Sequence, residues 1–170
     1  AEGLDPEAAR ARLDDFAPDV VVSLVGSVSW KEDRVFLSDL AEDGARVVAI
    51  GDVLHEDPER RLAGEAWLEA ILDDFASDAL LRYLDGERDG LDGMSVRGAD
   101  GTVVSLPPAR DKQYRVSRPR HELFPERGYH FSFARRAPFA TVLTDYGCPF
   151  PCNFCVISTL PFRTRAVEDV

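Results

Sequence analysis

Cysteine is absent from the first 147 residues of this 170-residue chain, and all three cysteines fall within residues 148–155. Most of the sequence therefore cannot carry a disulfide framework, which needs paired cysteines along the chain. Three is also an odd number, so disulfides cannot use every thiol. Clustered thiols in a chain without a secretion signal favour a metal site.

Long apolar runs are missing as well. No stretch approaches the roughly 20 residues that a membrane helix needs, and the N-terminal residues lack the charged and apolar parts of a signal peptide. With 45% hydrophobic residues the chain can still bury a core. We therefore expect a soluble, cytoplasmic protein with no membrane partner.

Positive charge is scarce in the first half. Residues 1–93 carry 9 Lys and Arg against 24 Asp and Glu, whereas residues 94–170 carry 11 against 7. Binding to phosphate backbones needs clustered cations, so a nucleic-acid partner is not expected. The arginines of the second half, including Arg163 and Arg165, are expected to be solvated surface residues.

Helix and strand signals alternate in the first part of the chain. Asp5-Pro6-Glu7 and Asp57-Pro58-Glu59 each place an N-cap, a first-turn proline and an acid where a helix begins. The predicted order is helix 5–16, doubly buried strand 19–25, helix 31–43, strand 46–51, a helix from Asp57, strand 70–75, and a helix 77–84 capped by Ser77. Residues 70–75 could instead continue the preceding helix, but a strand keeps the alternation regular. This order predicts an α/β fold with an open parallel sheet.

Aspartate and glycine crowd residues 85–93, a loop composition that marks the end of a first domain, 1–93. Residues 94–97 and 102–105 flank a Gly-rich turn and predict a small β-hairpin. It opens a linker, 94–138, that is rich in Pro and Arg. We expect the linker to be anchored by packed aromatics: Tyr114, Phe124, Tyr129, Phe131 and Phe133.

A third segment, 139–170, begins with a predicted strand at residues 139–144, and the three cysteines follow on the loop that leaves it. Active sites of barrels and open α/β sheets lie on such loops. Three thiolates on a cubane of four irons would leave one iron open for a ligand. A zinc or disulfide site is the alternative, although His121 and His130 lack zinc-finger spacing.

The pattern Cys148-x-x-x-Cys152-x-x-Cys155, with Phe154 directly before the last cysteine, resembles the radical S-adenosylmethionine superfamily. The resemblance implies that the three cysteines bind a [4Fe-4S] cluster and that Phe154 packs near the adenine of S-adenosylmethionine. It further implies a 5'-deoxyadenosyl radical, an electron donor such as flavodoxin or ferredoxin, and a TIM-like barrel of which residues 139–170 are only the beginning.

The first domain resembles the cobalamin-binding, Rossmann/flavodoxin-like domain that precedes the barrel in one branch of this superfamily, with the first strand missing. The stretches that carry this likeness are residues 18–23, residues 48–51, the hairpin and residues 118–124. The resemblance implies that Ser23 and Gly51 line a pocket for the nucleotide tail of cobalamin. Two features depart from the pattern of this branch. Asp52 stands where many relatives have a second glycine. The sequence also lacks the cobalt-ligating histidine motif, so His55 is only an isolated candidate for that role.

The resulting expectation is a cobalamin-dependent radical enzyme that methylates or rearranges an unactivated carbon, with the substrate undefined. Methylthio transfer is the alternative within enzymes, and the absence of cysteine before residue 148 opposes it. A non-catalytic cobalamin- or partner-binding module with a zinc-filled cysteine loop is the alternative from another class. A domain of this type that has lost its cobalamin is a further possibility.

Overall fold

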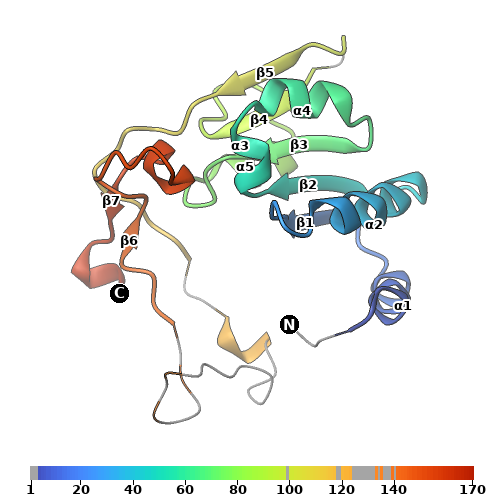
Figure 1. Cartoon of the computed structure of the whole chain (residues 1–170), viewed down its shortest axis with the longest axis horizontal. Coiled ribbons are helices and arrows are strands. Elements are labelled where there is room, and N and C mark those ends of the chain that lie inside the picture. Colours follow the sequence, from blue (N-terminus) through green and yellow to red (C-terminus); the bar gives the residue numbers. More distant parts are fainter. Residues whose placement is uncertain are drawn as a thin grey trace.

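A computed structural model describes residues 4–98, 100–117, 120–123, 133, 135, 139 and 141–170. Helices and strands alternate through the first half of the chain and give way to short elements in the second (Figure 1). The helices are α1 (Pro6–Phe16), α2 (Trp30–Glu42), α3 (Asp52–His55), α4 (Pro58–Gly64) and α5 (Ala79–Leu84), with 3-10 turns η1 (His121–Leu123), η3 (Val156–Thr159) and η4 (Val167–Asp169). The strands are β1 (Val20–Leu24), β2 (Arg46–Ile50), β3 (Leu68–Leu72), β4 (Met94–Arg97), β5 (Val103–Leu106), β6 (Asp145–Tyr146) and β7 (Arg163–Thr164).

The first five strands form one sheet in the order β1-β2-β3-β4-β5 (Figure 1). β1, β2 and β3 are parallel to one another, while β4 runs antiparallel to β3 and β5 antiparallel to β4. The α/β class is confirmed, but the expected all-parallel sheet becomes a mixed one. The reason is that the predicted hairpin joins the sheet through β3, so the boundary drawn after residue 93 falls between two paired strands.

Helices cover both faces of this sheet, and each face has its own apolar core. Successive side chains of a strand point to opposite faces, so Val47 and Ala49 pack on one side and Val48 on the other. The first core also takes in α2, α3 and α4 through Leu37, Leu40, Leu54 and Leu62. The second takes in α5 and the following loop through Ala79, Tyr83 and Leu91. Each fully buried leucine contributes about 2 kcal/mol.

The helix starts follow the predicted capping. The Asp5 side chain accepts a hydrogen bond from the amide of Ala8 at 2.8 Å, and the Asp57 side chain accepts one from the amide of Arg60 at 3.0 Å. Both caps precede a proline, as a helix start prefers. α5 begins at Ala79 with Asp78 at the N-cap position, but the capping hydrogen bond comes from Ser77, whose hydroxyl accepts from the amide of Ala79 at 3.3 Å.

Two strands differ from expectation. β1 was predicted to be buried on both faces, yet the side chain of Leu24 is 80% exposed, because β1 is the edge of the sheet. β3 spans Leu68–Leu72 rather than residues 70–75. It ends there because the amides of Asp73 and Asp74 both turn to the carbonyl of Gly93.

The strand predicted for residues 139–144 is also wrong, since residue 139 and residues 141–144 adopt no regular structure. Their apolar side chains are exposed, so nothing packs them into a sheet. The cysteines follow the two-residue β6 instead, and no barrel is present in the described residues. Of the linker aromatics, Tyr114 is buried as expected and Phe133 is exposed, while Phe124, Tyr129 and Phe131 lie outside the described residues.

Among the helices that the structure describes, none combines the length and the apolar character that crossing a membrane requires.

Candidate functional site

The cysteines lie on a loop that is closed at its base by two short strands. β6 and β7 pair antiparallel, with Tyr146 opposite Arg163. We call these strands and residues 147–162 between them the cysteine hairpin. Gly147 has a φ of 76°, and an added Cβ would overlap the carbonyl oxygen of Pro161. Only glycine therefore lets the chain enter the loop so close to the segment that leaves it.

Hydrogen bonds within the loop connect two of the three cysteines. The amide of Cys155 donates to the carbonyl of Cys152 at 3.2 Å. The Ser158 hydroxyl donates to the carbonyls of Cys155 at 2.6 Å and Cys152 at 3.3 Å. These bonds fold residues 152–158 into a compact turn, which draws the backbone of Cys152 and Cys155 together.

All three thiols are free, with Cys148 and Cys155 half-buried and Cys152 exposed. As donors they suit an iron–sulfur cluster in number and chemistry, because thiolates are the ligands such clusters use. Across the described part of the chain, however, no three Cys, His, Asp or Glu side chains are gathered closely enough to hold a metal ion. The three thiols therefore have the number and chemistry that an iron–sulfur cluster needs, but their side chains are not arranged around a common centre.

Phe154 has a side chain that is 88% exposed. Other phenylalanines of this chain are similarly exposed, Phe16 at 79% and Phe133 at 84%, so exposure alone does not mark a binding residue. It lies beside Cys155 at the outside of the turn and contributes to neither core cluster of the sheet. Its ring is therefore accessible to a planar ligand bound at the loop.

The other predicted binding residues sit in or beside the parallel strands. Ser23 is half-buried within β1 and pairs with Ala49 of β2. Gly51 is buried directly after β2, where an added Cβ would overlap the carbonyl oxygen of Val25. Gly51 thus has a packing role: it lets the ends of β1 and β2 approach closely. The structure does not bring Ser23 or Gly51 together with the cysteines in any described contact.

Asp52, the residue after Gly51, joins the loops that follow β1 and β2. Its carboxylate accepts hydrogen bonds from the amide of Ser27 at 3.0 Å, the hydroxyl of Ser27 at 2.9 Å and the amide of Val53 at 2.8 Å. The Ser27 hydroxyl bond is the main cause that lowers the pKa of Asp52. Donors that an anionic ligand would use are therefore already bound to a carboxylate, which does not fit a phosphate at this loop.

His55 ends α3 and lies against the residue that follows β3. Its Nδ1 is 3.1 Å from Oδ1 of Asp73, and both side chains are largely buried. The alignment is not that of a hydrogen bond, so Oδ1 is a buried acceptor without a donor among the described residues. The other Asp73 oxygen accepts a bond from the Ser95 hydroxyl at 3.3 Å.

This pair opens onto a cavity of about 260 Å³ at the carboxyl edge of the sheet. Its walls come from α3, α4, the ends of β3 and β5, and one residue of the cysteine hairpin, Leu160. The sheet and the cysteine hairpin therefore both contribute walls to this cavity. Its size suits a small group rather than a whole large cofactor.

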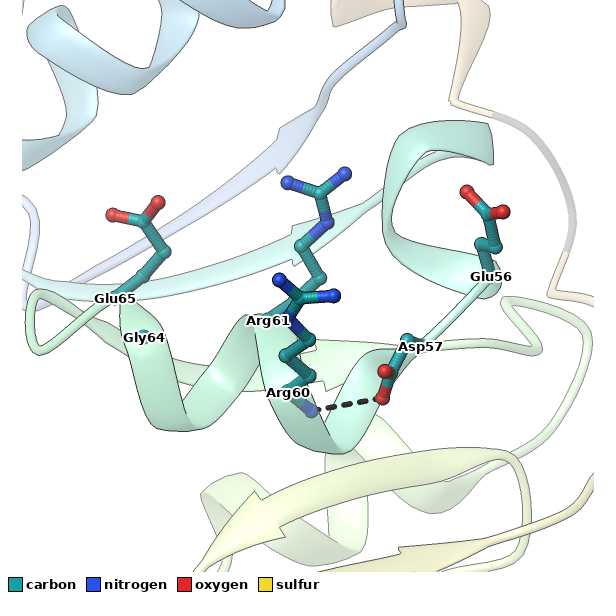
Figure 2. A pocket seen from close by; sticks show the side chains of 6 residues that line it. All are labelled: Glu56, Asp57, Arg60, Arg61, Gly64 and Glu65. Carbon is teal, nitrogen blue, oxygen red and sulfur yellow. Dashed lines mark hydrogen bonds between the residues drawn. The ribbon is translucent and has the colours of Figure 1, made fainter.

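A second hollow, of about 570 Å³, lies along α4 and is lined only by residues 56–65 (Figure 2). Figure 2 shows Arg60 and Arg61 rising between Glu56 and Asp57 at one end and Glu65 at the other. Charges of both signs alternate there, and Glu65 is already paired with Arg34 at 2.8 Å. No ligand class is favoured by such a mixture.

No family model matches the chain, and no curated protein matches its sequence. The site must be interpreted from its own residues.

One buried ion pair beside the candidate site was not predicted from the sequence. Arg163, expected to be a solvated surface residue, is 3% exposed and lies 2.6 Å from the buried carboxylate of Asp74. The available signal was the sequence Asp73-Asp74 directly after a buried strand, since a carboxylate there needs a donor. Nothing local identified Arg163 as that donor.

Proposed function

We propose that this chain belongs to a radical S-adenosylmethionine enzyme, in which Cys148, Cys152 and Cys155 hold a [4Fe-4S] cluster. The observation that carries the proposal is the set of three free thiols, spaced C-x-x-x-C-x-x-C on one loop that β6 and β7 close. A structural zinc site takes four ligands as a rule, whereas this loop carries three cysteines.

Held by Cys148, Cys152 and Cys155, such a cluster would have one iron free of thiolate for S-adenosylmethionine, and the electron it supplies would cleave that cofactor to methionine and a 5'-deoxyadenosyl radical. The electron would come from a flavodoxin- or ferredoxin-type donor. The protein would bind the cluster and S-adenosylmethionine, orient them and shield them from water.

Three features of the cysteine hairpin support this binding and orienting role. Gly147 permits the tight entry into the loop, and Ser158 fixes the backbone of Cys152 and Cys155 through its two hydrogen bonds. Phe154 presents an exposed ring next to the last cysteine, where stacking on an adenine would bury it. The abstracted hydrogen belongs to a substrate whose contacts lie outside these residues, so methylation and rearrangement are both compatible with the site.

We propose cobalamin as the ligand of the α/β unit. The supporting observation is His55 at the wall of the shared cavity, because imidazole is a common metal ligand and this one lies 3.1 Å from the buried carboxylate of Asp73. The hydrogen bonds from Ser27 to Asp52 count against a phosphate at the neighbouring loop. Titration with hydroxocobalamin should shift the cobalt absorbance bands, and His55→Ala should abolish the shift. An unchanged spectrum for the unsubstituted chain would show that the α/β unit does not bind cobalamin.

Anaerobic reconstitution tests the cluster itself. We expect about four iron and four sulfide ions per chain. Cys148→Ser, Cys152→Ser and Cys155→Ser should each lose most of the iron. His121→Ala, which removes a possible ligand outside the loop, should retain it.

The same preparation, extended to the complete protein and reduced, should release 5'-deoxyadenosine from S-adenosylmethionine. Stoichiometric zinc in place of iron would instead support a non-catalytic module.

A further inference from the structure

Asp74 and Arg163 form a buried ion pair across 89 residues of sequence. Nη2 of Arg163 lies 2.6 Å from Oδ2 of Asp74, and the two side chains are 3% and 0% exposed, in that order. Burying two charges is costly unless they are held together in good geometry. Their position therefore fixes where two distant parts of the chain meet: the turn after β3 and the start of β7.

The turn after β3 orients the carboxylate from the side of the sheet. Oδ1 of Asp74 accepts a hydrogen bond from the amide of Ala76 at 2.9 Å, and the amide of Asp74 donates to the carbonyl of Gly93 at 3.1 Å. Gly93 has a φ of 80°, and an added Cβ would lie 2.6 Å from the Cβ of Asp74. The turn after β3 thus orients one oxygen of the carboxylate, and Arg163 of the cysteine hairpin donates to the other.

Aromatic rings enclose the arginine. Its guanidinium carbon lies 4.9 Å from the ring centre of Tyr146 and 5.8 Å from that of Tyr114. Phe75, which follows Asp74, meets Tyr146 edge to face at 4.8 Å. These rings exclude water, which strengthens the attraction between the two charges and adds cation–π contacts.

Tyr146 directly precedes the cysteine loop, and Arg163 directly follows it. Tyr146 pairs with Arg163 across β6 and β7, and Gly147 and Cys148 follow Tyr146 directly. Leu160 packs against the cluster of Ala76, Tyr114 and Tyr146 from the far end of the loop. Both ends of the loop are therefore attached to the same point at the carboxyl edge of the sheet.

We propose that Asp74 and Arg163 are positioning residues that dock the cysteine hairpin onto the α/β unit, so that the cysteine loop is held beside the cavity lined by His55, Asp73 and Leu160. A ligand held at that edge then lies on the side of the sheet where the cysteine loop is attached. The docking itself needs no metal; only its consequence for a cluster rests on the function proposed above.

Hydrogen exchange of the metal-free chain tests the docking. The reporters are the amides of Tyr114 and Thr164, which bond to the carbonyls of Thr164 at 3.2 Å and Lys112 at 3.1 Å beside the ion pair. Arg163→Met alone leaves a lone buried carboxylate, so the double variant Asp74→Asn with Arg163→Met removes both charges together. The side-chain oxygen of the introduced asparagine keeps the acceptor for the amide of Ala76.

In the double variant the Tyr114 and Thr164 amides should exchange about tenfold faster or more, as expected for local opening, while those of Val48 and Ile71 in the sheet stay protected. Arg163→Lys, which retains the charge, should restore most of the protection. Arg82→Met, which breaks the exposed 2.7 Å pair with Glu87, is the matched control and should change neither set. Unchanged exchange at Tyr114 and Thr164 in the double variant would overturn the proposal.

Thiol reactivity gives the second readout, again without metal. Reaction with a disulfide reagent should quicken severalfold at Cys148 and Cys155, which are half-buried, and little at Cys152, which is already exposed. Equal rates in the double variant and the unsubstituted chain would contradict a docked loop. If the unsubstituted chain binds no iron–sulfur cluster, the proposed function fails, whereas the exchange and thiol results still decide the docking.

Discussion

The carboxylate of Asp52 accepts hydrogen bonds from both the amide and the hydroxyl of Ser27, at 3.0 and 2.9 Å. Ser27 follows β1 and Asp52 follows β2, so one side chain closes the carboxyl edge between two parallel strands. Ligands of open α/β sheets bind at this edge. In this chain the carboxylate of Asp52 lies at that edge, so the protein itself supplies a negative charge there.

Removing that charge should strengthen cobalamin binding. In Asp52→Asn the carboxylate no longer repels the phosphate of the nucleotide tail, and the dissociation constant for hydroxocobalamin should fall about tenfold. Spectroscopic titration at fixed ionic strength measures it. Asp43→Asn, which neutralises another exposed carboxylate, is the control for net charge. An equal constant for Asp52→Asn and the unsubstituted chain would show that the tail does not approach this loop.

Gly51→Ala should destabilise the fold. The added methyl group would overlap the carbonyl oxygen of Val25, forcing β1 and β2 apart at a cost of about 2 to 3 kcal/mol. Gly64 in α4 has nothing within 4 Å of an added Cβ, so Gly64→Ala should be neutral or stabilise by up to about 1 kcal/mol. Urea unfolding monitored by circular dichroism gives both values. Equal stability of the two variants would rule out the close approach.

Tyr83 should make the stability of the chain fall at alkaline pH. Burial, together with the hydrogen bond to Glu69 at 2.5 Å, raises the pKa of Tyr83 from 10.0 to about 12. A raised pKa means that the folded state holds the proton more tightly, so this stabilisation is complete below pH 10 and is lost as the pH rises to about 12.

The unfolding free energy of the unsubstituted chain, followed from about pH 8 upward, should therefore drop above pH 10. In Tyr83→Phe the drop should be smaller, with the remainder due to Tyr114 and Tyr146, whose pKa values burial also raises. A drop of the same size in Tyr83→Phe would contradict this assignment.

Local signals in the sequence predicted local structure well. Asp5 and Asp57 cap their helices as expected, because capping involves residues three positions apart. The mixed sheet and the exposed Leu24 were not predicted, since strand composition does not tell which strand lies at an edge. The strand expected from Phe139 failed for a similar reason: an apolar run forms a strand only where a neighbour pairs with it.

The candidate site was predictable only in its ligands. Cys148, Cys152 and Cys155 are recognisable from spacing, and their role stays a prediction. Their placement depends on Arg163, whose partner Asp74 lies 89 residues away. Such a contact is set by how the sheet and the hairpin pack, which no local pattern records.

The most direct test for an iron–sulfur cluster with one open iron is electron paramagnetic resonance of the reconstituted, reduced chain with and without S-adenosylmethionine. We expect the signal of a reduced [4Fe-4S] cluster that changes shape when S-adenosylmethionine is added, because the cofactor binds the iron that lacks a thiolate. A cluster signal that S-adenosylmethionine leaves unchanged, or a chain that takes up zinc and no iron, would contradict the account.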